Sequence, residues 1–123
     1  TNPRILRLDG DGLEMRDFLY AEDAARLVVH IARQPAEEPV IVNGGNGRGI
    51  SVGEVARHLI KATGNGGITE IQFSGIRRKG DPVNLVADVD RLRRMGFRSE
   101  FAFDSGIGEL VRWGQSIGDR KVA

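Results

Sequence analysis

Short apolar runs alternate along this chain with segments whose apolar residues recur at helical spacing. Five runs, bounded by residues that break regular structure, predict short strands at residues 5–8, 15–19, 40–43, 68–73 and 84–87. Four periodic segments predict amphipathic helices over residues 22–34, 52–63, 88–95 and 103–117. Strands that alternate with helices in this way favour an α/β fold.

The run at residues 40–43 is apolar without alternation, which is typical of a strand buried on both faces in a parallel sheet. We expect this strand to pair with a larger sheet. Left unpaired, its edge would promote association with another copy, so we expect a homodimer.

Several residues predict where the helices begin and end. Ser51 and Glu54 have the spacing of a capping box at the start of the second helix. Asp88 is expected to cap the short third helix. Gly96 is expected to end that helix in a left-handed conformation, with an apolar contact from Phe97. Trp113 is expected to anchor the last helix in the core.

Composition narrows the possible functions of the chain. Its 123 residues suit one domain, and its net charge of +1 implies no general attraction to nucleic acid or membranes. Cysteine is absent, which excludes disulfides and thiol chemistry. We expect a cytoplasmic location. The sequence opens without methionine and leads directly into the first strand, which favours a piece of a longer protein over a processed terminus.

Two short strings set an arginine near an aspartate, Arg16 before Asp17 and Arg78 before Asp81. The guanidinium group is a planar fork of donors that matches phosphate oxygens two at a time. Two such forks at one place would suit a diphosphate. Taken alone, each string is better explained by a surface ion pair.

Six motifs in register carry a family resemblance. They are Gly-x-Gly-x-x-x-Arg-Asp-Phe from Gly10 with an aspartate at Asp23, a glycine-rich loop at 42–47, Ile-Ser-Val-Gly-Glu-Val at 50–55, Arg-Lys-Gly-Asp at 78–81, Ala-Asp-Val-Asp-Arg at 87–91, and Met-Gly-Phe at 95–97. In this order the chain resembles the C-terminal part of NAD-dependent sugar-nucleotide epimerases and dehydratases, such as UDP-glucose 4-epimerase. These enzymes form the extended branch of the short-chain dehydrogenase/reductase family, which has a Rossmann-type fold.

The resemblance implies that residues 1–123 form the nucleotide-sugar-binding portion of such an enzyme. Arg16 and Arg78 would contact the diphosphate from two sides, and Asp81 would accept hydrogen bonds from the ribose. Tyr20 and Asn43 would lie near the site, and Asp23 would cap or orient its helix. The complete enzyme would act at C4 of a hexose.

The chain lacks the parts that hydride chemistry requires in this family. In this family the catalytic tyrosine is followed four residues later by a lysine. Here the residue four positions after Tyr20 is Ala24. The loop at 44–49 lacks the Gly-x-Gly-x-x-Gly spacing of a dinucleotide turn. We therefore expect no catalytic, cofactor-binding or metal-binding residues here. An N-terminal Rossmann portion absent from the chain would bind NAD, and the chain alone would be inactive.

Other functions have weaker support. The acidic stretch from Asp9 to Glu14 does not fit a calcium-binding EF-hand, because Glu14 stands where that loop needs glycine. His30 and His58 are expected at the surface. Arginines between residues 91 and 98 are offset by aspartates and lack the aromatic residues that stack on nucleic-acid bases. A stand-alone, non-catalytic binding or assembly module remains an alternative.

Overall fold

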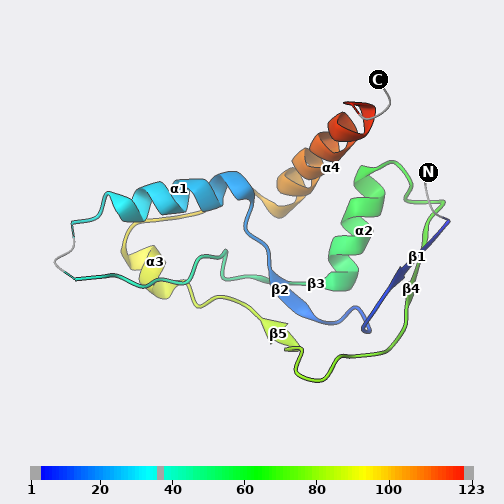
Figure 1. Cartoon of the computed structure of the whole chain (residues 1–123), viewed down its shortest axis with the longest axis horizontal. Helices are drawn as coiled ribbons and strands as arrows, with labels where there is room; N and C mark the ends of the chain where they lie inside the picture. Colours follow the sequence, from blue (N-terminus) through cyan, green and yellow to red (C-terminus); the bar gives the residue numbers. More distant parts are fainter. Residues whose placement is uncertain (1–3, 36–37, 121–123) are drawn as a thin grey trace.

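A computed structural model describes residues 4–35 and 38–120 of the chain, which form nine elements of regular structure (Figure 1). The strands are β1 (Ile5–Leu8), β2 (Met15–Asp17), β3 (Gly49–Ser51), β4 (Glu70–Phe73) and β5 (Asn84–Leu85). The helices are α1 (Ala21–Ala32), α2 (Val52–Ala62), α3 (Asp90–Arg94) and α4 (Phe103–Arg120). The predicted α/β class is therefore confirmed. None of the described helices is both long and apolar enough to cross a membrane.

The described strands form two small sheets. β1 and β4 pair in parallel, and β2 is the central strand of a mixed sheet, antiparallel to β3 and parallel to β5. In Figure 1 the β1–β4 pair lies at one end of the molecule with α2, whereas α1 and α3 lie at the other end. The backbone of Arg16 is held on both sides in the mixed sheet, opposite Ile50 and Leu85.

A small apolar cluster lies between α1 and α3. Val89, Leu92 and Phe97 are buried at its centre, and Leu27, Ile31, Val42 and Ala87 pack around them. Gly96 has a φ of 86°, and the Phe97 amide donates to the Leu92 carbonyl at 3.3 Å. The predicted left-handed stop and the apolar contact beyond it are therefore confirmed.

The capping-box prediction for α2 is also confirmed. Ser51 Oγ accepts from the Glu54 amide at 3.2 Å, and the Ser51 amide donates to Glu54 Oε2 at 3.0 Å. Hydrogen bonds from the backbone and then the side chain of Ser51 lower the pKa of Glu54. For α3, Asp88 Oδ1 accepts from the Asp90 amide at 3.0 Å, although the N-cap position belongs to Val89.

The prediction of a buried strand at residues 40–43 is wrong. This segment is irregular and pairs with no strand among the described residues, and Ile41 is 80% exposed. β propensity alone does not make a strand without a partner to complete its hydrogen bonds. The segment is held instead by Asn43, which donates to the Asp88 carbonyl at 3.2 Å, and by Arg91, which donates to the Ile41 carbonyl at 3.0 Å. The homodimer expected from this segment stays a prediction.

Two further side chains differ from expectation. Trp113 is 62% exposed, whereas Ile107 of the same helix is buried at 8% exposure. His30 is half-buried rather than solvent-facing, with Nε2 2.8 Å from the Met95 carbonyl and its ring 5.6 Å from that of Phe97. His58 is partly exposed, as expected, and lies 2.7 Å from Asp104.

Asp23 neither caps α1 nor faces solvent. The N-cap is Tyr20, which makes no side-chain capping bond. Asp23 is 1% exposed, and its carboxylate accepts from the backbone amides of Glu100 (3.0 Å) and Phe101 (2.9 Å). Arg26 also pairs with it at 2.6 Å. Asp23 was expected to cap or orient its helix. The capping role is wrong, whereas these bonds to the segment that leads into α4 fit the orienting role.

Candidate functional site

The three residues predicted to bind substrate line one pocket of about 210 Å³. Arg16 comes from the central strand β2, whereas Arg78 and Asp81 come from the loop between β4 and β5. The other lining residues are Asp9, Gly10, Glu14, Val52, Ile76, Arg77, Pro82 and Val83. The fold thus brings together groups that are far apart in the sequence.

Strand pairing determines the place of Arg16. β2 is hydrogen-bonded on both sides, so the backbone at this residue has little freedom. The side chain is half-buried, and Nη1 donates to the neighbouring Met15 carbonyl at 2.8 Å. That bond uses one of the five guanidinium N–H donors, which leaves others for an oxyanion in the pocket.

The loop that carries Arg78 and Asp81 is pinned near both ends. The Gly10 amide donates to the Ile76 carbonyl at 3.0 Å, and the Met15 amide donates to the Val83 carbonyl at 2.8 Å. The side chain of Arg78 is 79% exposed and lies 3.8 Å from Asp9 Oδ2. An exposed pair of this kind contributes little to stability, so Arg78 is free to take an anionic ligand instead.

Acidic side chains before β2 meet the basic side chains of this loop. Arg77 Nη2 pairs with Asp11 Oδ2, and Arg77 Nε lies 3.9 Å from Glu14 Oε1. The hydrogen bond from the Leu13 amide is the largest effect on the pKa of Asp11 and lowers it. Desolvation opposes this, and the hydrogen bond and charge of Arg77 add to the lowering. Sequence reasoning noticed the acidic stretch from Asp9 to Glu14 but assigned it no role. The usable signal was the charge complementarity between residues 9–14 and residues 77–79.

Asp17 does not pair with Arg16. Its carboxylate accepts from the backbone amides of Asn46 and Gly47, both at 2.8 Å, and of Ala87 at 3.3 Å. The aspartate therefore shapes the glycine-rich loop from within. Sequence reasoning missed this role, because the partners lie far along the chain.

The glycine-rich loop does not fit the phosphates of a dinucleotide. A phosphate would need backbone amides that are free to donate, whereas those of Asn46 and Gly47 already donate to Asp17. The aspartate's negative charge would also repel a phosphate. The Asn46 and Gly47 amides are therefore not available to a phosphate.

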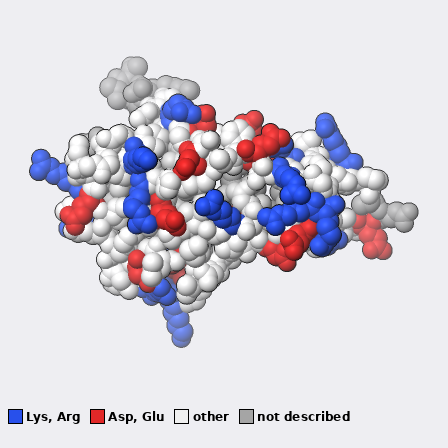
Figure 2. All heavy atoms as spheres, turned by 180° about the vertical axis from the view of Figure 1, so that it is seen from behind, with Lys and Arg blue, Asp and Glu red and all other residues white. Residues whose placement is uncertain are grey.

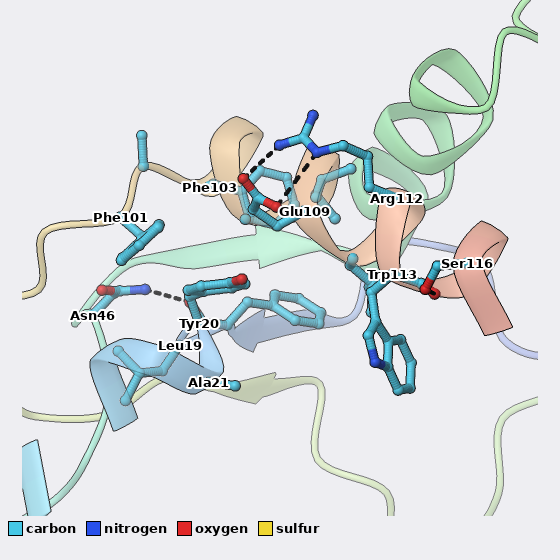
Figure 3. A pocket seen from close by; sticks show the side chains of 15 residues that line it. Leu19, Tyr20, Ala21, Asn46, Phe101, Phe103, Glu109, Arg112, Trp113 and Ser116 are labelled. Atoms are coloured by element: carbon cyan, nitrogen blue, oxygen red, sulfur yellow. Dashed lines mark hydrogen bonds and ion pairs between the residues drawn. The ribbon is translucent and has the colours of Figure 1, made fainter. Parts of the chain in front are cut away.

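A larger, mainly apolar pocket of about 750 Å³ lies between the start of α1 and α4 (Figure 3). Figure 3 shows Tyr20 and Phe101 on one side of it and Trp113 projecting from α4. The Tyr20 and Phe101 rings lie 4.5 Å apart. Neither Tyr20 nor Asn43, which were expected near the substrate, is among the residues that line the pocket of Arg16 and Arg78.

Figure 2 shows basic and acidic side chains side by side on the visible face of the molecule. In the arginine cluster near α3, Arg93 lies 3.5 Å from Asp90 and Arg91 donates to the Ile41 carbonyl. No group of three or more His, Asp or Glu side chains suited to a metal ion occurs within residues 4–35 and 38–120.

Comparisons with known proteins bear on the family and the fold of the chain. A family model described as the NAD dependent epimerase/dehydratase family matches residues 4–45. The dTDP-L-rhamnose 4-epimerase of Burkholderia thailandensis is 32% identical over 120 residues, which cover 96% of this chain and 32% of that protein.

Two solved structures extend the likeness to the fold. TunA, an NAD-dependent NDP-hexosamine 5,6-dehydratase, is 28% identical with a TM-score of 0.76, over 92% of this chain and 36% of its own. MoeE5, solved with UDP-glucuronic acid and NAD, is 26% identical with a TM-score of 0.77, over 91% of this chain and 37% of its own. This chain thus spans about a third of the length of these relatives. Over nearly its whole length it resembles part of the enzymes of the NAD-dependent epimerase/dehydratase family.

Proposed function

We propose that this chain forms the nucleotide-sugar-binding part of an NAD-dependent epimerase or dehydratase that acts at C4 of a hexose. The observation that carries the proposal is the shared pocket of Arg16, Arg78 and Asp81. Relatives named for dTDP-, GDP-, ADP- and UDP-linked sugars support the substrate class.

The chemistry of the pocket suits a sugar joined to a nucleoside by a diphosphate. Arg16 would bind the diphosphate from the strand side, and Arg78 from the loop side, each through paired N–H donors. The diphosphate would take the place of Asp9 beside Arg78. Asp81, in the same loop, would accept hydrogen bonds from the ribose hydroxyls. Binding of the nucleotide would then orient the sugar for the reaction.

The reacting groups belong outside this chain in our proposal. NAD would supply hydride transfer to and from the sugar, bound by a part of the protein that precedes residue 1. The residues of this chain would hold the substrate only. We therefore expect the isolated chain to show no turnover.

Calorimetric titration of the protein as encoded by its gene tests the proposal, with UDP, dTDP, GDP and ADP as probes. Arg16→Ala and Arg78→Ala should each weaken the tightest of these by roughly 10- to 100-fold. Arg94→Ala is the control, since this exposed arginine on α3 lies outside the pocket. Thermal unfolding establishes that each variant is folded. If wild type binds none of the four, or if both pocket variants bind like the control, the proposal is wrong.

A further inference from the structure

Arg77 joins the loop of Arg78 and Asp81 to the turn that precedes β2. One end of its guanidinium group pairs with Asp11, and the other lies 3.9 Å from Glu14 Oε1. Resting on the proposed function, we propose that Arg77 is a positioning residue for the diphosphate site. It holds the loop in place and neutralises carboxylates that would otherwise repel the ligand.

The loop that carries Arg77 and Arg78 is held at both ends but is weakly restrained between them. Backbone bonds fix it at Ile76 and at Val83. Between these points the chain turns at Gly80, whose φ is 96°, and the Asp81 amide donates to the Arg78 carbonyl at 3.2 Å. Residues 77–81 are exposed, so few packing contacts restrain them. The Arg77 side chain adds a restraint directly beside Arg78.

The turn side of this contact is itself well ordered. Asp11 Oδ1 accepts from the Leu13 amide at 2.9 Å, and Glu14 Oε1 accepts from the Asp11 amide at 3.2 Å. Glu14 leads directly into β2, which carries Arg16. Arg77 therefore ties the loop of Arg78 to the hydrogen-bonded turn that leads into the strand of Arg16. The distance between the two arginines proposed to bind the diphosphate depends on this tie.

Three carboxylates lie in or beside the pocket that would take the diphosphate. Asp9 and Glu14 line it, and Asp11 lies beside them. The Glu14 side chain is only 13% exposed, and its Oε2 is buried without a hydrogen-bond partner among the described residues. Water screens such a charge poorly, so it acts strongly on a neighbouring anion. Arg77 supplies the compensating positive charge.

Three variants of the gene-encoded protein separate this role from a general effect of charge. Arg77→Gln removes the proposed contact. Lys79→Gln makes the same change of charge two residues away, on an exposed side chain that does not line the pocket. The double variant Arg77→Gln with Asp11→Asn removes one of the carboxylates that Arg77 neutralises.

Titration at low salt with the tightest-binding of UDP, dTDP, GDP and ADP is the first readout. Arg77→Gln should weaken binding about 5- to 10-fold, and Lys79→Gln less than about 2-fold. Adding Asp11→Asn to Arg77→Gln should restore at least half of the lost binding free energy. In Arg77→Gln itself, the affinity for the parent nucleoside should fall less than the affinity for the nucleoside diphosphate. A purely structural contact would not be rescued by removal of the carboxylate. Equal affinities for the Arg77 and Lys79 variants would overturn the inference.

Hydrogen exchange without ligand is the second readout. Exchange at the Gly75 and Asp81 amides should be faster in Arg77→Gln than in Lys79→Gln, because the loop loses a restraint. If exchange in Arg77→Gln equals that in Lys79→Gln while wild type binds nucleotide, the positioning role is wrong and the proposed function is unaffected. If Arg78→Ala loses binding but Arg77→Gln binds normally, the inference about Arg77 is wrong and the proposed function still holds. If wild type binds none of the probes, the proposed function itself fails.

Discussion

The Gly47 amide donates a hydrogen bond of 2.8 Å to Asp17 Oδ2. This contact links the end of the central strand to a loop that precedes β3. Asp17 is adjacent to Arg16, so the same bond also supports the strand end that carries the arginine proposed to bind the diphosphate. The second residue of the Arg-Asp-Phe string thus has a structural role beside the proposed binding role of the first.

Asp17→Asn should lower the free energy of unfolding by about 2–3 kcal/mol. Both carboxylate oxygens accept backbone N–H bonds, and an amide would direct its own N–H₂ at one of these donors. Urea unfolding measures the loss. Glu38→Gln, on an exposed side chain, is the control. A change of less than about 0.5 kcal/mol in Asp17→Asn would contradict the role assigned to this carboxylate.

Gly45→Ala should lower the free energy of unfolding by about 1–3 kcal/mol through overpacking. A Cβ at this position would lie 2.5 Å from Asp17 Oδ2 and 2.7 Å from Ala87 Cβ. Gly67→Ala is a matched control, since a Cβ there meets nothing within 4 Å. Chemical denaturation of the two variants should show a clear difference, and equal stabilities would mean that the loop is less tightly packed than described.

Asp23 should make stability depend on acid pH. Burial opposes its ionisation, but the amides of Phe101 and Glu100 and the Arg26 guanidinium outweigh this and lower the pKa of Asp23 below its ordinary value of 3.8. A carboxyl with a lowered pKa stabilises the fold above the unfolded-state pKa. That stability is lost as the pH falls through the folded-state pKa.

Wild type should therefore lose more stability than Asp23→Asn between about pH 6 and pH 3, as measured by urea unfolding. At the higher pH the variant should already be less stable than wild type, because the neutral amide pairs less well with these donors. Asp11 and Glu54 titrate in both proteins, so the difference between the two pH profiles isolates Asp23. Parallel profiles would argue against a buried, charged Asp23.

Trp113→Ala should cost less than about 1 kcal/mol, whereas Phe97→Ala should cost about 3–5 kcal/mol. The tryptophan is 62% exposed, and the phenylalanine is 5% exposed in the cluster between α1 and α3. Thermal unfolding of the two variants compares them directly. A large loss in Trp113→Ala would restore the expectation that this residue anchors α4 in the core.

Features that depend on neighbours in the sequence were predictable. The capping box of Ser51 and Glu54 and the left-handed stop at Gly96 need only residues within one or two helical turns. The helical periodicity of α1 and α4 is equally local. The proposed pairing of Arg16 with Arg78 came from the family resemblance, since spacing alone does not say which distant residues meet.

The sequence by itself thus determined the α/β class, the places of the helices and the motifs that indicate the family. Only the tertiary structure decided that residues 40–43 remain irregular, that Asp17 and Asp23 accept backbone amides, and that Arg77 faces Asp11 and Glu14. The physical reason is that strand pairing and burial of a charge depend on partners far along the chain, whereas capping and helical periodicity depend on residues close by.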